Sequence, residues 1–270
     1  MLSERYTHIQ TNNKNKATME KKYEMLMDDS VSFVYRGAWH TLYRIKSLQE
    51  FGDVSKGDIG GYIEREDNLS HSGNCWVYCD ARVFDNASVL GNAAVSGNAL
   101  ILANATIRDN AFVTNDARVT GFALVCDDAH ISDNAIVSDS ATIRGYAQIL
   151  GNAKVRDRAI VGGVARVRGN SAVIDDAQVD GICSIHGEAL ICGNAIIDDD
   201  SDYIVFKNWW SSGRYFTWTR LNNMWAVGCF YGTGEELIRE AYEDSERSGR
   251  EYERVVRYTE GIMQDYYNRK

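Results

Sequence analysis

Residues 81–119 read ARVFDNASVLGNAAVSGNALILANATIRDNAFVTNDARV, and the period of this stretch decides the fold. Alanine stands at every sixth position from Ala81 to Ala165. Small residues continue this phase as far as position 195: Ser171, Ala177, Cys183, Ala189 and Ala195. Valine or isoleucine follows two residues later in all twenty hexads from Val83 to Ile197. So strict a period indicates a solenoid, because every turn of a solenoid buries the same positions against the turns above and below.

Each hexad can be written Ala-x-Val-x-Gly/Asp-x. Its alanine and valine are two residues apart, so both side chains face the same side of an extended strand, which we assign to the interior. The fifth position holds glycine ten times and aspartate eight times, residues that tolerate the left-handed backbone of a corner. The pattern therefore predicts an all-β solenoid, a left-handed parallel β-helix with three short strands in each coil of 18 residues.

The hexad register also extends backwards from Ala81. Gly73, Cys75 and Val77 fit it, and Ile63 and Leu69 then fall on the alanine phase. We assign the β-helix to residues 57–200, which gives about seven to eight coils with no inserted loop after residue 75.

A different composition precedes the solenoid. Residues 1–18 are polar and are expected to form a flexible tail. Residues 19–56 are expected to form a small N-terminal α/β cap, with a short helix over 19–27 and strands over 31–39 and 42–45. Because the open strand edges of a solenoid invite association, the cap should cover the first coil, where Trp76 and Tyr78 would pack against it.

A small α+β domain is predicted for residues 201–270. Aromatic and β-forming residues between 203 and 231, with turn signals at 211–213 and 222–223, indicate three short antiparallel strands. Thr233 and Glu236 have the spacing of a capping box, which places a helix start near residue 234. The apolar pattern predicts a second helix over about 250–268.

Composition limits the classes of function. A net charge of −9 and a pI of about 5.1 argue against general nucleic-acid binding. The polar N-terminus and the lack of a long apolar run predict a cytoplasmic protein without membrane contact. Six cysteines without CxxC or zinc-type spacing indicate reduced thiols and predict no metal site.

One side of the predicted prism carries more outward apolar residues than the others. These residues should be covered by the C-terminal domain or by another subunit, and they favour a homo-oligomer, a dimer or trimer. They are Phe84, Leu100, Leu102, Ile136, Ile174, Leu190 and Cys192.

The hexads resemble those of the hexapeptide-repeat left-handed β-helix superfamily, best known from trimeric acyltransferases. Residues 42–83, LYRIKSLQEFGDVSKGDIGGYIEREDNLSHSGNCWVYCDARV, look like the opening segment of bacterial and prophage proteins labelled as hexapeptide-repeat acyltransferases. Residues 209–238, WWSSGRYFTWTRLNNMWAVGCFYGTGEELI, resemble the aromatic tail of prophage members. The resemblance implies the fold, whereas activity has to be argued from the site.

Acyltransferases of this superfamily use a histidine as general base, often on an inserted loop, because the attacking hydroxyl or amine must lose a proton. His130 and His186 are the candidates here, both outward on one prism side and three coils apart. Neither lies on an insertion, so surface histidines without a catalytic role are the alternative.

Two further groups could bind a ligand. The first is a basic belt between residues 144 and 168, with Asp157 as its one acidic residue: Arg144, Lys154, Arg156, Arg158, Arg166 and Arg168. Such arginines could hold a phosphate, a nucleotide or an acidic partner, or simply pair with corner aspartates. The second is the aromatic tail, either a stacking platform or a domain core: Trp209, Arg214, Trp218 and Arg220.

These observations favour a non-catalytic cytosolic binding protein built on a rigid β-helix. A phage-encoded inhibitor that sequesters a host defence component, in the host cytoplasm, is the more specific hypothesis. It requires no cofactor. The alternative is a coenzyme-A-dependent acyltransferase, for which acyl-CoA would be the cosubstrate.

Overall fold

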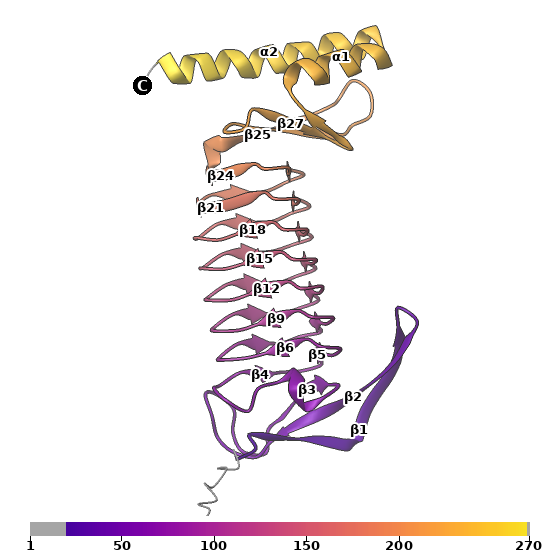
Figure 1. Ribbon diagram of the computed structural model, residues 1–270, viewed down its shortest axis with the longest axis vertical. Coiled ribbons are helices and arrows are strands. Elements are labelled where there is room, and N and C mark those ends of the chain that lie inside the picture. The colour runs from indigo at the N-terminus through magenta and orange to yellow at the C-terminus, as the bar shows by residue number, and fades with distance from the viewer. Residues whose placement is uncertain (1–19, 269–270) are drawn as a thin grey trace, which may run out of the picture.

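A computed structural model describes residues 20–268, so the predicted tail at 1–18 lies outside the described residues. The chain forms a tall stack of coils with a long hairpin at its N-terminal end, and a small sheet and two helices at its C-terminal end (Figure 1). The predicted solenoid is confirmed as a left-handed β-helix of about eight turns.

Three parallel sheets form the sides of the prism, and successive strands in the chain belong to successive sides. Side one contains β3 (Ile59–Ile63), β5 (Arg82–Val83), β8 (Leu100–Ile101), β11 (Arg118–Val119), β14 (Ile136–Val137), β17 (Lys154–Val155), β20 (Ala172–Val173) and β23 (Leu190–Ile191). Side two contains β6 (Ser88–Val89), β9 (Thr106–Ile107), β12 (Leu124–Val125), β15 (Thr142–Ile143), β18 (Ile160–Val161), β21 (Gln178–Ile182) and β24 (Ile196–Asp199). Side three contains β4 (Trp76–Val77), β7 (Ala94–Val95), β10 (Phe112–Val113), β13 (His130–Ile131), β16 (Gln148–Ile149), β19 (Arg166–Val167) and β22 (Ser184–Ile185).

The interior is the predicted ladder of alanine and valine or isoleucine. Every alanine of the series from Ala81 to Ala195 is buried in one continuous core. The valine or isoleucine two residues after each small position, from Val83 to Ile197, is buried in the same core. Cys183 replaces alanine there, and burial raises the pKa of its thiol to about 12, so the thiol stays protonated and packs as a small apolar group.

The corners adopt the left-handed backbone that the fifth hexad position predicts. Positive φ angles recur every six residues from Asp85 to Gly193. Corner carboxylates accept hydrogen bonds from the backbone N–H groups of the next coil, as Asp133 does from Gly151 at 2.8 Å. A second ladder stacks amide side chains, with Asn92 donating to Asn110 over 3.1 Å and Asn110 donating to Asp128 over 3.1 Å.

The first coil differs from the others in length. Ile63 pairs with Val83 and Leu69 bridges to Val89, a step of 20 residues, whereas Val77 pairs with Val95 at the regular step of 18. Ile63 and Leu69 therefore lie beneath valines, and their predicted place on the alanine phase is wrong. Two extra residues between Leu69 and Val77 cause the shift, and no register change follows from Val77 to Val179.

The N-terminal cap is a β-hairpin, made of β1 (Tyr23–Tyr35) and β2 (Ala38–Ser47). The helix predicted over 19–27 is wrong, because pairing of Tyr23–Leu26 with β2 overrides the local helix propensity. The strand predicted over 31–39 is interrupted by a turn at Arg36 and Gly37, both with positive φ as in a tight two-residue hairpin turn. β2 adds antiparallel to β3 and so extends side one.

Lys22 and Tyr23 close the N-terminal end of the prism. The Lys22 ammonium donates to the carbonyl oxygens of Gly73 and Cys75, at 3.2 and 2.8 Å. The Tyr23 hydroxyl lies 2.8 Å from the Leu69 carbonyl oxygen, and its ring meets Trp76 edge-on. As predicted, the cap covers the first coil.

The C-terminal end is closed by an antiparallel sheet of four strands: β25 (Tyr203–Lys207), β26 (Tyr215–Thr219), β27 (Met224–Val227) and β28 (Phe230–Gly232). The predicted turns at 211–213 and 222–223 are confirmed. The predicted number of three strands is wrong, because a further turn at Gly228 creates β28. Two short 3-10 turns, η1 (Glu66–Asn68) and η2 (Asp200–Asp202), lie next to the first and last coils.

Two helices complete the C-terminal unit. α1 (Gly234–Asp244) begins at the predicted capping box, in which the Glu236 N–H donates to Thr233 Oγ1. α2 (Glu246–Asn268) begins four residues earlier than predicted. Within residues 20–268, neither helix combines the length and apolar character needed to cross a membrane.

The apolar side of the prism is covered at both ends. The hairpin packs Val31, Phe33 and Tyr35 against Phe84 and Leu102, which is a cover that the sequence did not predict. At the other end, Thr217 of the C-terminal sheet accepts a hydrogen bond from the Leu190 N–H, and Cys192 is buried. Ile136 and Ile174 stay half-exposed between the two covers.

Candidate functional site

The two predicted histidines lie on side three, as expected. His130 belongs to β13, and His186 directly follows β22, three strands away in the same sheet. His186 is exposed. His130 is half-buried and stacks on Phe112 with ring centroids 5.2 Å apart.

His130 has the more unusual environment of the two. Its Nε2 atom is buried and has no hydrogen-bond partner among the described residues. Burial lowers the pKa of the imidazole, so the neutral form is favoured at pH 7. A neutral imidazole nitrogen can accept a proton only where a substrate reaches it, which would require the buried Nε2 atom to be uncovered.

Half of the basic belt is neutralised by aspartates. Arg158 contacts Asp176 through two hydrogen bonds of 2.6 Å, and Arg144 lies 3.2 Å from Asp180. Arg156 lies 3.7 Å from the adjacent Asp157. The pairing alternative therefore holds for these three arginines, although Asp157 is the one corner residue among their three aspartates.

Arg166 and Arg168 differ from the three paired arginines of the belt. Both are exposed, both flank the inward Val167 on side three, and neither forms an ion pair with a described residue. His186 lies one coil above Arg168. This face offers a small cationic surface, whereas the belt as a whole does not.

The aromatic tail divides between core and surface. Trp218 is 2% exposed and belongs to the core of the C-terminal unit, whereas Trp209 is 74% exposed. Arg214 is exposed in the turn before β26. Trp209 and Arg214 do not join Trp218 and Arg220, so the predicted platform of four residues does not form.

Trp218 and Arg220 instead line a cavity of about 370 Å³ between the β26–β27 hairpin and α2. Trp225, Leu221, Met263 and Tyr267 complete its apolar walls. Its volume and largely apolar lining fall within the range of small-ligand pockets.

Polar groups at the cavity are held in fixed positions. The Trp218 indole donates to Asn223 over 2.9 Å. Arg220 forms an ion pair with the buried Asp202 and lies over the Tyr266 ring, 5.0 Å from its centroid. Asp202 also accepts from the backbone N–H groups of Asp198 and Asp199, each at 2.9 Å. The cavity is therefore anchored to the last coil of the β-helix.

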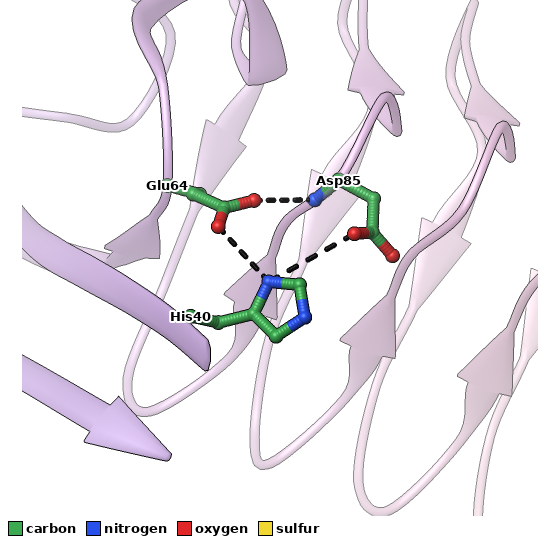
Figure 2. Close-up of side chains that lie close together, drawn as sticks. All are labelled: His40, Glu64 and Asp85. Atoms are coloured by element: carbon green, nitrogen blue, oxygen red, sulfur yellow. Dashed lines mark hydrogen bonds and ion pairs between the residues drawn. The ribbon is translucent and has the colours of Figure 1, made fainter. Parts of the chain in front are cut away.

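A third cluster lies between the hairpin and the first coils (Figure 2). His40 Nδ1 is 2.9 Å from Glu64 Oε1 and 3.8 Å from Asp85 Oδ1. The imidazole is buried against Phe33 and Phe84. The cluster can hold a charge or coordinate a cation.

Sequence reasoning missed this cluster because its members come from three elements. His40 is in β2, Glu64 follows β3, and Asp85 is a corner residue after β5. Of the three residues, the hexad pattern placed only Asp85, which it assigned to a corner. The one available signal was a histidine directly before the run TLYRI, residues 41–45, and such a histidine is more often a core residue.

Comparison with protein-family models finds no match for this chain. A stretch of 52 residues is 42% identical to part of an Escherichia coli (strain K12) protein named "Uncharacterized acetyltransferase YdcK". The match covers 19% of this chain and 16% of that protein. The stacked coils and this partial match fit a hexapeptide-repeat superfamily.

Proposed function

We propose that this chain is a non-catalytic binding protein whose site is the cavity between the β26–β27 hairpin and α2. The observation that carries the proposal is the lining: indole and phenol rings and aliphatic side chains around about 370 Å³ of space. We infer a small planar aromatic ligand, because such a ligand can stack on these rings.

Hydrogen bonding at the cavity supports a ligand with a polar edge. No hydrogen bond satisfies the Trp225 indole N–H within residues 20–268, which leaves this donor available. Asp202 fixes the Arg220 guanidinium at the cavity wall, where Glu260 also lies, so this side chain loses little entropy on binding.

The β-helix holds this site on a rigid support. Asp202 links the cavity wall to the last coil, and Tyr203 donates from its hydroxyl to the Ser184 carbonyl oxygen over 2.7 Å. A site built on such a support loses little free energy to ordering when its ligand binds.

The test uses 1-anilinonaphthalene-8-sulfonate, an anion with a planar naphthalene ring system whose fluorescence rises in apolar sites. We expect saturable binding of one dye per chain. Met263→Trp fills the cavity and should weaken binding at least about tenfold, in line with the loss of about 1.4 kcal/mol. Ile262→Trp, on the adjacent exposed position outside the cavity, should leave binding unchanged.

Both variants are compared by circular dichroism and thermal midpoint to establish that they fold. Equal affinity of the two folded variants, or an absence of saturable binding to the wild type, would refute the site.

Two exposed surfaces of the β-helix support binding of macromolecular partners as well. Arg166 and Arg168 on side three would face an acidic partner surface. Tyr146, Val164 and Ile182 are exposed and lie above one another in consecutive coils, which supports a homo-oligomer, a dimer or trimer. A phage-encoded inhibitor that sequesters a host defence component in the cytoplasm would be one case of this binding function.

Acyl transfer from coenzyme A is the second candidate. It is supported by the name of the partially matching Escherichia coli protein and by the neutral, unpartnered imidazole of His130. On this hypothesis acetyl-CoA would bind across side three, and His130 would accept the proton of the attacking hydroxyl or amine.

A further inference from the structure

Three side chains that neither candidate function uses meet between the hairpin and the coils. His40 Nδ1, a Glu64 oxygen and an Asp85 oxygen all lie within 4.8 Å of one another. Figure 2 shows both carboxylates directed at the same imidazole nitrogen. The chain brings them together from three separate elements, so their convergence depends on the fold.

The spacing of the ligand atoms suits one metal ion. Imidazole nitrogen and carboxylate oxygen bind zinc at about 2.0–2.2 Å, so two ligands of the same ion lie about 3–4 Å apart. The distance of 3.8 Å from His40 Nδ1 to Asp85 falls in that range, and the hydrogen bond of 2.9 Å to Glu64 would lengthen slightly to admit the ion.

Backbone N–H groups orient both carboxylates. The second oxygen of Glu64 accepts a hydrogen bond from the Asp85 N–H at 2.7 Å. The second oxygen of Asp85 accepts one from the Ala103 N–H at 3.1 Å. Each carboxylate therefore turns one oxygen toward the imidazole, as outer hydrogen bonds do in metal sites.

The charges of the cluster are not balanced by a described basic side chain. Arg65 is close, but it bonds the backbone oxygen of Asp85 and the side chain of Asn86, not the carboxylate. His40 is the one cationic partner that Glu64 and Asp85 have among the described residues, and only when it is protonated. With a neutral imidazole, two partly buried carboxylates remain for a divalent cation to neutralise.

We propose that His40, Glu64 and Asp85 hold one divalent transition-metal ion of the zinc class, which ties the N-terminal hairpin to the first two coils. The imidazole ligand favours zinc over magnesium or calcium, which prefer oxygen ligands. The ion would join β2 to the ends of β3 and β5 at the place where the hairpin crosses side one.

Isothermal titration of the full chain with Zn²⁺, after removal of any polyhistidine tag and treatment with chelator, tests this site. We expect one Zn²⁺ per chain and a rise in thermal midpoint, because an ion that binds only the folded state stabilises it. Mg²⁺ under the same conditions should give neither. Glu64→Gln and Asp85→Asn, which keep the side-chain shapes, should each weaken Zn²⁺ binding about 100-fold.

The matched control is the histidine–carboxylate pair of the first coil, His71 and Glu66. His71 Nε2 lies 2.7 Å from Glu66, and among residues 20–268 no second carboxylate pairs with it, so His71→Gln should keep Zn²⁺ binding. Absence of stoichiometric Zn²⁺ binding by the folded wild type would overturn the proposal. Unchanged affinity in both folded variants, Glu64→Gln and Asp85→Asn, would do the same.

Discussion

At the scale of single residues, the corners carry the backbone strain of the fold. Glycine occupies ten corner positions, and at eight of them a Cβ would meet the next coil: at Gly121 it would lie 2.6 Å from the Asp139 nitrogen. Aspartate and asparagine occupy others, where they tolerate the same conformation. Ala103, with φ of 60°, has neither advantage.

Ala103→Gly should therefore stabilise the protein. The left-handed conformation costs a residue with a Cβ about 1–2 kcal/mol, and the greater chain entropy of glycine offsets part of the gain. We expect the free energy of unfolding to rise by about 0.5–1 kcal/mol, measured by chemical denaturation.

The control is Ala105→Gly, two residues away on the inward phase. It removes a buried methyl group from the core without relieving a positive φ, so it should lower the stability. A destabilising Ala103→Gly would contradict the assignment of strain to this corner.

At the scale of elements, the hairpin β1–β2 is held to the coils by aromatic packing. Phe84 is buried on the outer face of the solenoid and meets Phe33 and Tyr35 edge-on, with ring centroids 5.5 and 5.6 Å away. The burial of Phe84 depends on the hairpin, because its side chain points out of the solenoid and would be exposed to solvent if the hairpin did not cover it.

Phe84→Ala should lower the free energy of unfolding by about 3 kcal/mol, since it leaves a cavity beneath the hairpin. Phe122→Ala, on a solenoid position that is 70% exposed, should change it by less than about 0.5 kcal/mol. Chemical denaturation of the two variants measures the difference. Equal effects would show that the hairpin does not cover Phe84 in solution.

At the scale of the whole molecule, sequence determined the solenoid and much less of what surrounds it. The inward alanine and valine phases and the corners could be predicted because one local pattern fixes each coil against its neighbours. The 20-residue first coil could not, since the two extra residues before Val77 carry no hexad signal.

The candidate sites were harder to predict because they depend on long-range pairing. The sequence analysis placed residues 31–39 in one strand and so did not predict the hairpin turn at Gly37. Without that turn, the position of His40 opposite Phe33 could not be predicted. Trp218 and Arg220 were predicted as binding residues, but only the packing of α2 distinguishes them from Trp209 and Arg214.

The most direct test of the binding function is amide hydrogen exchange, measured by mass spectrometry with and without 1-anilinonaphthalene-8-sulfonate and, separately, with acetyl-CoA. We predict that the dye slows exchange in β26, β27 and the second half of α2, and leaves the coils unchanged. Dye protection elsewhere would contradict the proposed binding site. Protection of side three around His130 by acetyl-CoA, without dye protection at the cavity, would favour acyl transfer.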